Sequence, residues 1–153
     1  MARSPREVVE QVRRMVAGEG VVFSDLFAED GVLRYPFAFP GQPPELRGRA
    51  AIRDHFAAPS SGSARAAFDM DGVDALVRET DDPEVVVAEI EHHGRSRVTG
   101  EAYRFRALAV VRVRDGLIVE YDDYMDALAA ARLLGRTSDL VAALTASPPA
   151  GGG

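Results

Sequence analysis

The chain has 153 residues, which suits one compact domain, and its 46% hydrophobic and 27% charged residues are typical of soluble globular proteins. A net charge of −6 without a dense basic cluster argues against nucleic acid as a partner, and the absence of cysteine excludes disulfides and thiol chemistry. No apolar run approaches the roughly 18 residues of a membrane span, and the N-terminus lacks the apolar core of a signal peptide. These features predict a cytoplasmic protein with no membrane partner.

Helical spacing and turn signals organise the first part of the chain. They predict a helix, a second short helix, a short strand, a proline-rich loop and a third helix, in that order: 5–17, 21–27, 32–37, 40–45 and 49–57. Ser4 fits the N-cap of the first helix, with Glu7 as its capping-box partner. Asp30-Gly31 marks a turn before the short strand.

Strand patterns dominate the second part, with four strands predicted at 68–80, 85–93, 102–114 and 117–125. The strand over 102–114 is the clearest, because its odd positions are apolar or aromatic and its even positions include four arginines. Such alternation is typical of an antiparallel sheet that is covered on one side. Asp115-Gly116 predicts a tight hairpin after it.

The last part of the chain is predicted to contain one helix over 127–134 and a disordered tail over 145–153, which leaves 1–144 as the domain. Three helices followed by antiparallel strands indicate an α+β fold, in which a cone-shaped, curved antiparallel sheet wraps around helices. A sheet curved in this way and closed by helices encloses a pocket suited to a small molecule.

Four segments together resemble a known family: LFAEDGVLRYPF, LRGRAAIRDHF, VVVAEIEHHGR and VRDGLIVEYDDYMDALAAARLLG. Their order and spacing resemble the SnoaL-like group of the ketosteroid isomerase and nuclear transport factor superfamily, from about Val8 to Gly135. The motifs look most like those of phenazine-biosynthesis condensing proteins and polyketide cyclases. The resemblance implies a cofactor-independent acid/base enzyme of secondary metabolism, an isomerase, cyclase or condensing lyase acting on a small apolar carbonyl compound. It also implies a homodimer formed through the arginine-rich outer surface of the sheet.

Asp123 is the foremost catalytic prediction. In a regular strand it shares a face with Leu117, Val119, Tyr121 and Met125, so it is expected on the cavity wall. A desolvated carboxylate there has a raised pKa, which suits proton transfer near neutral pH. The resemblance assigns the same position a general acid or base role. The alternative is a solvated or salt-bridged acid at the open end of the cone.

Glu89 and Glu91 are predicted to share one face of their strand, where Glu91 is a catalytic partner of Asp123 and Glu89 a pocket residue. The alternative is that both glutamates pair with arginines of the next strand, such as Arg104 or Arg106. Epoxide hydrolases of this superfamily carry an arginine and an aspartate two residues apart on this strand. Here a glutamate stands at the arginine position, which counts against epoxide hydrolysis.

Tyr35 and His55 complete the predicted catalytic group. Tyr35 is expected on the same face as Leu33 and Phe37, where its hydroxyl would bind a substrate oxygen or a structural partner. His55 lies beside Phe56 on a predicted helix and would shuttle protons or fill the core. The residues predicted to line the pocket are Leu33, Glu89, Tyr103, Phe105, Ala107, Val119, Tyr121 and Met125.

Two functional classes remain open from the sequence: an acid/base enzyme and a module that binds a small molecule or dimerises without catalysis. The sequence contains no glycine-rich phosphate loop and no histidine pair at metal-ligand spacing, so no metal or cofactor is predicted. The feature that separates the two classes is whether Asp123 and Glu91 face each other in a dry pocket.

Overall fold

The helices of the protein begin and end where local capping and apolar spacing place them. In α1 (Pro5–Val16), the Ser4 side chain accepts a hydrogen bond from the Glu7 backbone N–H, and the Glu7 side chain accepts one from the Ser4 N–H. This confirms the predicted capping box. The computed structural model describes residues 1–59 and 65–146. The other described helices are α2 (Arg49–Ala57), α4 (Ala127–Leu133), α5 (Thr137–Ala146) and a short 3-10 helix (Phe23–Leu26).

Six strands form one curved, open sheet in the order β2-β1-β6-β5-β4-β3. Their bounds are β1 (Phe27–Arg34), β2 (Glu45–Arg47), β3 (Phe68–Glu79), β4 (Val85–Ser96), β5 (Ala102–Arg114) and β6 (Leu117–Met125). The meander from β3 to β6 is antiparallel, as predicted. β1 runs parallel to β6, so the sheet is mixed and the prediction of a purely antiparallel sheet is wrong in this detail. The long chain between β1 and β6 allows this parallel pairing.

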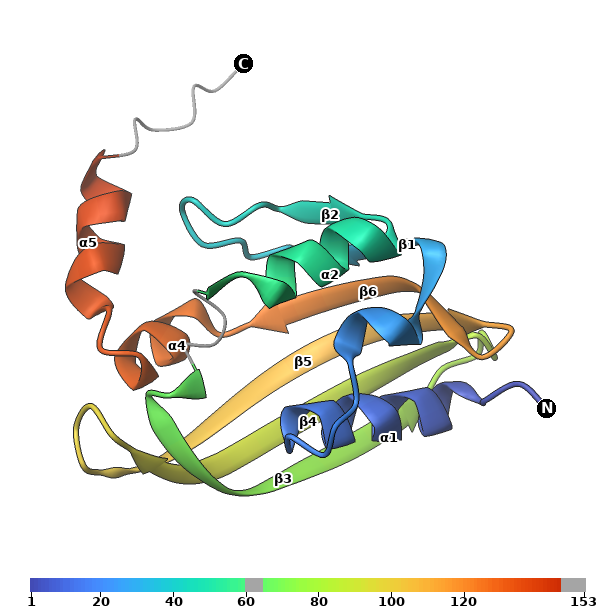
Figure 1. Ribbon diagram of the computed structural model, residues 1–153, viewed down its shortest axis with the longest axis horizontal. Helices are drawn as coiled ribbons and strands as arrows, with labels where there is room; N and C mark the ends of the chain where they lie inside the picture. Colours follow the sequence, from blue (N-terminus) through green and yellow to red (C-terminus); the bar gives the residue numbers. More distant parts are fainter. Residues whose placement is uncertain (60–64, 147–153) are drawn as a thin grey trace.

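The helices cover one face of the sheet, which we call the inner face, and the opposite face is the outer face (Figure 1). α1 packs against β3, β4 and β5, and α2 packs against β1. Val8 and Val9 of α1 are buried against the inner face, together with Ala88 and Val111 from the sheet. The core therefore lies between the helices and the concave side of the sheet. Within the described part of the chain, no helix has both the length and the apolarity needed to cross a membrane.

The hairpin between β5 and β6 contains a register shift that changes which side chains of β6 point inward. Asp115 and Gly116 both adopt positive φ, 52° and 78°, as a tight hairpin turn requires. The pairing shifts between Arg112 and Val113, so Val113 lies opposite Ile118, and Ile118 is 0% exposed. Because the bulge shifts the alternation, Leu117 does not share the inner face with Tyr121, contrary to prediction. Val119 lies within the shift and is half-buried.

The predicted short strand near residue 32 differs most from the structure. β1 begins at Phe27, so Asp30-Gly31 lies inside an irregular strand and not in a turn. The strand ends at Arg34, which places Tyr35 and Phe37 beyond it. Phe37 is 69% exposed and contacts Tyr124 edge-on at 5.4 Å, so the expectation that it shares the inner face is wrong.

Two elements were not expected from the sequence. β2 has three residues, too few to show a periodic pattern, and is held by pairing with β1. α5 follows α4 after Gly135 and projects away from the sheet (Figure 1). The predicted disordered tail, 145–153, overlaps the end of this helix, and residues 147–153 lie outside the described residues.

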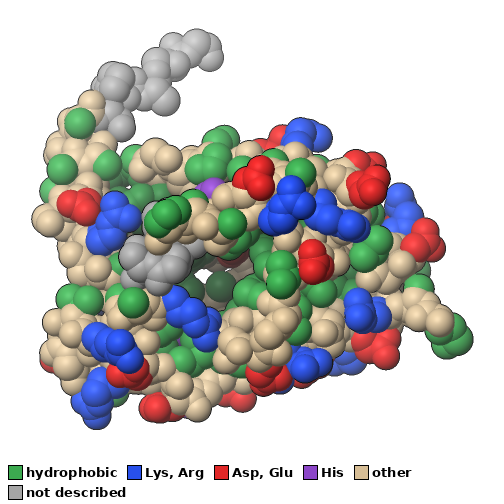
Figure 2. Space-filling view, in the orientation of Figure 1, with side chains coloured by type: hydrophobic (Ala, Val, Ile, Leu, Met, Phe, Trp, Pro, Cys, Tyr) green, Lys and Arg blue, Asp and Glu red, His purple; other side chains and the backbone are tan. Residues whose placement is uncertain are grey.

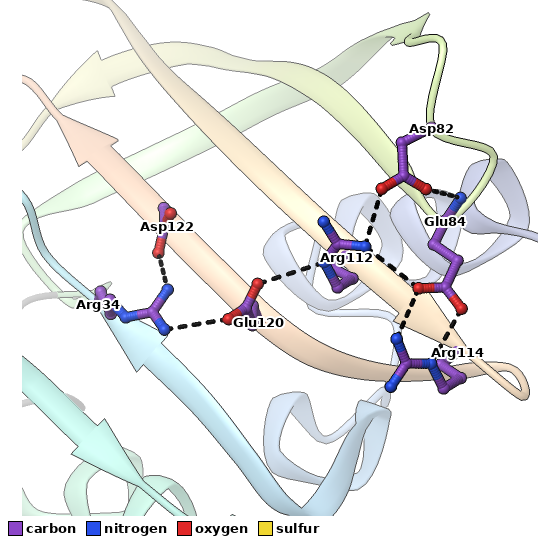
Figure 3. Close-up of polar contacts among 7 residues, drawn as sticks. All are labelled: Arg34, Asp82, Glu84, Arg112, Arg114, Glu120 and Asp122. Carbon is purple, nitrogen blue, oxygen red and sulfur yellow. Dashed lines mark hydrogen bonds and ion pairs between the residues drawn. The ribbon is translucent and has the colours of Figure 1, made fainter.

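Ion pairs link the strands on the outer face of the sheet. Figure 3 shows Arg34 between Asp122, at 3.0 Å, and Glu120, at 3.1 Å. Glu120 also contacts Arg112 at 3.3 Å, and Arg112 continues to Asp82 at 2.9 Å. The acids and arginines of neighbouring strands alternate here, so their charges are neutralised within the sheet.

Candidate functional site

The inner face of the sheet is built from small side chains at the position of Asp123. Asp123 lies opposite Ala109 on β5, and Ala109 lies opposite Ala88 on β4. Both alanines are almost completely buried. Ala88 and Ala109 belong to the packed hydrophobic core of the inner face. Asp123 therefore lies on the inner face of the sheet, opposite Ala109, and its catalytic role stays a prediction.

Asp123 is half-buried as a residue, but one of its two carboxyl oxygens is fully buried. Its Oδ1 atom is inaccessible to solvent and has no hydrogen-bond partner among the described residues. Burial raises the pKa of Asp123 to about 6. A carboxyl group with this pKa exchanges protons readily near neutral pH, which is a property of general acids and bases.

Two tyrosines accompany Asp123. Leu33 of β1 lies opposite Tyr121 of β6, and Tyr35, just beyond the end of β1, is close enough for the charge of Asp123 to act on it. Tyr35 is 7% exposed and Tyr121 is 6% exposed. Burial, followed by the nearby charge of Asp123, raises the pKa of both hydroxyls, so both remain protonated donors at neutral pH. The structure therefore brings together one carboxyl and two phenol groups.

A cavity of about 810 Å³ opens beside this group, between α1, β3 and β4. Figure 2 shows the molecule hollowed between the helices and the long strands, with apolar side chains inside the opening. Phe23 and Phe56 line the cavity, while Asp123 is not among its lining residues. The ring of Phe23 meets Tyr121 edge-on at 5.4 Å and Phe56 at 5.2 Å. Phe23 thus lines the cavity and contacts Tyr121, which does not line it.

Glu89 and Glu91 lie on the outer face, and the predicted pairing of Glu91 with Asp123 in one pocket is wrong. Glu91 accepts hydrogen bonds from Arg104 and Arg106, the latter at 2.8 Å, and its pKa is lowered chiefly by Arg106. Glu89 pairs with Arg78 at 3.0 Å. The alternative from the sequence, pairing with arginines, is the one the structure contains. The even positions of β4 face inward, so both glutamates point away from the cavity.

His55 is half-buried on α2, and its ring meets Phe56 edge-on at 5.1 Å. Its contact is thus with a residue that lines the cavity. Ala107 and Met125 lie opposite each other on the inner face, and both are half-buried. Among the described residues, no cluster of three or more histidine or acidic side chains could hold a metal ion.

His92 is an inner-face residue that the sequence analysis did not select. It lies on β4 at an even position, in line with Val86, Ala88 and Ile90. It lines the cavity, and its Nδ1 atom lies 2.9 Å from the hydroxyl of Tyr103. The predicted pocket residues Tyr103 and Phe105 surround its ring. Because β4 has valines at odd as well as even positions, no signal in the sequence would place His92 on the inner face.

Comparison with known proteins agrees with this fold. The SnoaL-like domain family matches residues 8–121. The uncharacterized PhzA/B-like protein PA3332 of Pseudomonas aeruginosa is 30% identical over 129 residues, which are 84% of this chain and 87% of that protein. A "putative isomerase" from Bacillus subtilis, of known structure, is 26% identical, with a TM-score of 0.68 over 86% of this chain and 95% of its own.

A "putative polyketide cyclase" from Xanthomonas campestris shares the fold, with a TM-score of 0.60, 21% identity and coverage of 84% of this chain and 95% of its own. The family match ends at Tyr121, two residues before Asp123. The observed fold, the segment matched by the family and the similar proteins all indicate the same family. The chain belongs to the SnoaL-like domain family and has the ketosteroid isomerase-like α+β fold.

Proposed function

We propose that the protein is an acid/base enzyme that moves a proton on a small apolar carbonyl compound, with Asp123 as the proton-transfer group. The observation that carries the proposal is the buried Oδ1 atom of Asp123, which has no hydrogen-bond partner among the residues described. Leaving a buried polar atom unpaired costs free energy, so its retention favours a role in binding or catalysis.

The residues around Asp123 support a simple proton-transfer cycle. The carboxylate removes a proton from the carbon next to the carbonyl group, and the C–H electron pair forms a C=C bond while the carbonyl oxygen becomes an oxyanion. A phenol of Tyr35 or Tyr121 donates a hydrogen bond to that oxygen, because both hydroxyls stay protonated. Asp123 then returns the proton to a different carbon of the conjugated enolate, which gives isomerisation. Alternatively, the enolate carbon forms a C–C bond with a second carbonyl group, and the resulting alkoxide takes up the proton held by Asp123, which gives cyclisation or condensation.

The apolar surroundings favour this chemistry over hydrolysis. The aromatic rings of Phe23, Phe27 and Tyr121 pack against one another at the inner end of the cavity. Such walls exclude water, which strengthens the interaction between a tyrosine hydroxyl and a developing oxyanion. The substrate reaches Asp123 past Phe23, since this ring separates the open cavity from Tyr121.

The test compares two adjacent aspartates in proton exchange on 2-tetralone, an apolar bicyclic ketone. Exchange of its α-protons in D₂O is followed by NMR, above the rate in buffer alone. We expect wild type to accelerate exchange and Asp123→Asn to lower the acceleration by about a hundredfold or more. Asp122→Asn is the matched control, because Asp122 faces Arg34 on the outer side of the sheet.

Two results would contradict the proposal. One is exchange no faster with wild type than with buffer, although the ketone binds with saturation. The other is equal loss of exchange in both variants, which would indicate damage to the fold and not to the site. Binding without exchange is the outcome expected of a non-catalytic binding module.

A second copy of this chain is the partner that we propose for the outer face. Leu76, Glu89, Leu108 and Tyr124 occupy one row across β3 to β6. Leu76 is 52% exposed and Leu108 is 39% exposed, which leaves apolar surface uncovered in the centre of the sheet. Positively charged arginines and negatively charged acids both surround this row. The surface can therefore be complementary to itself, as a two-fold symmetric interface requires.

A further inference from the structure

The cavity on the inner face of the sheet contains an aromatic cluster, which lies some distance along the sheet from Asp123. The ring of His92 stacks on Phe68 at 5.3 Å and meets Phe105 at 5.1 Å. His92 lies opposite Phe105, four residues along β5 from Ala109, the partner of Asp123. At about 3.3 Å per residue, this is roughly 13 Å along the strand. The cluster is therefore a second centre on the inner face.

His92 and Tyr103 form a hydrogen-bonded pair that keeps one donor available. Burial, with a contribution from Arg65, lowers the pKa of His92 to about 4, so the imidazole is neutral at neutral pH. A neutral imidazole carries one N–H and a phenol carries one O–H. One of these two hydrogens is used in the 2.9 Å contact between Nδ1 and the hydroxyl. Whichever tautomer is present, the other hydrogen is left for a ligand.

Arg65 lies at the rim of the same cavity and has no carboxylate partner in the part of the chain that the structure describes. Its Nη1 donates to the backbone oxygen of Val16 at 2.9 Å, at the C-terminal end of α1. Gly18 permits this approach, because it has a φ of 77° and a Cβ there would come within 2.6 Å of Nη2. No acidic side chain of the described chain lies within ion-pair distance of Arg65, whereas Arg97 of the same cavity pairs with Asp69.

The structural role of Arg65 uses only part of its hydrogen-bonding capacity. Its contact with Val16 satisfies a carbonyl at a helix end, which is a common role for arginine. A guanidinium group has five N–H donors, and this contact engages one of them. The remaining donors have no hydrogen-bond partner among residues 1–59 and 65–146, so they and the positive charge are free of the described residues at the rim of the cavity.

We propose that Arg65, His92 and Tyr103 form a binding subsite for an aromatic carboxylate. The ring of the ligand stacks in the cluster of Phe68 and His92, and its carboxylate accepts hydrogen bonds from Arg65 and from the free donor of the His92–Tyr103 pair. Asp71 and Asp69 are nearby acids, since the charges of both act on Tyr103, and the charge of Asp69 is paired with Arg97. The subsite does not depend on chemistry at Asp123, and it adds a ligand class to the cavity.

The test uses 2-naphthoate and its neutral amide, 2-naphthamide, as probes of equal shape. Dissociation constants are measured by NMR titration, with the ring protons of His92 and Phe68 as reporters. For wild type we expect 2-naphthoate to bind about tenfold more tightly than 2-naphthamide, as a charge-assisted hydrogen bond provides. Arg65→Gln should remove this preference, and Arg65→Lys should retain part of it.

Control variants separate this subsite from the rest of the protein. Arg47→Gln removes an arginine whose side chain is 71% exposed on β2, and should leave both dissociation constants unchanged. Asp123→Asn should also keep the preference for the acid, whether or not Asp123 is catalytic. Equal affinity of wild type for the two probes, absence of binding, or a preference that persists in Arg65→Gln would each overturn the proposal.

Discussion

Asp122 and Asp123 are neighbours in the sequence, yet they lie on opposite faces of β6 in opposite environments. Asp122 points to the outer face and contacts Arg34 at 3.0 Å. Asp123 points to the inner face, where its Oδ1 has no partner among the described residues. Burial raises the pKa of Asp123 to about 6. The same type of side chain is thus an ion-paired anion on one face and an acid with a raised pKa on the other.

The outer face repeats this pairing along its strands. Hydrogen bonds from Arg114 and Arg112 lower the pKa of Glu84 to about 2, and the hydrogen bond from Arg34 is the largest cause of the lowered pKa of Glu120. On the inner face the opposite holds, because apolar neighbours replace water without supplying a positive charge. The face of the sheet, more than the residue type, decides the chemistry of each carboxyl.

Replacing a leucine by alanine should reveal the largest difference in stability between the two faces. Leu33 is 1% exposed on the inner face, and we expect Leu33→Ala to lower the free energy of unfolding by about 2–5 kcal/mol. Leu76 is 52% exposed on the outer face, so Leu76→Ala should cost under about 1 kcal/mol. Urea denaturation of dilute protein measures both. Equal losses would show that the outer face is as tightly packed as the inner one.

The pH dependence of stability should distinguish Asp123 from Asp122. The pKa of Asp123 is near 4 in an unfolded chain and about 6 in the folded protein, so folding favours the protonated acid. Wild type therefore loses stability as the pH rises from about 4 through about 6, by roughly 2–3 kcal/mol at pH 8. Asp123→Asn has no charge to bury and should be more stable than wild type at pH 8 by up to that amount.

Urea denaturation at pH 4, 6 and 8 checks this expectation. The two proteins should be similar at pH 4 and diverge as the pH rises. Asp122→Asn is the control, and it should show no gain at pH 8 because it removes the ion pair with Arg34. Parallel pH profiles of wild type and Asp123→Asn would show that Asp123 is not buried as a charge in solution.

The substitutions that test the proposed dimer should have the smallest effect on the fold itself. Leu108→Glu places a charge in the centre of the outer face and should convert a dimer into a species with the 16.5 kDa mass of one chain. Val141→Glu, at a residue 55% exposed on α5, should leave the mass unchanged. Light scattering after size exclusion measures both. A wild type with the mass of one chain would refute the proposed assembly.

Local sequence signals were sufficient for most elements and for the position of Asp123. The Ser4–Glu7 capping box, the alternation of β5 and the Asp115-Gly116 hairpin depend on neighbouring residues, and each appears in the structure as predicted. Asp123 lies beyond the register shift of β6, in line with Tyr121, so alternation placed it correctly. Such features are readable because the physical cause lies within a few residues.

Only the tertiary structure decided which groups accompany Asp123. Alternation shows that Glu89 and Glu91 share a face, but β4 has valines on both faces, so it could not show which one is inside. Pairing with β5 directed both glutamates to the arginines and turned His92 inward. Likewise, the parallel pairing of β1 with β6 brought Tyr35 near Asp123. These arrangements depend on register between strands far apart in the chain, which no local pattern encodes.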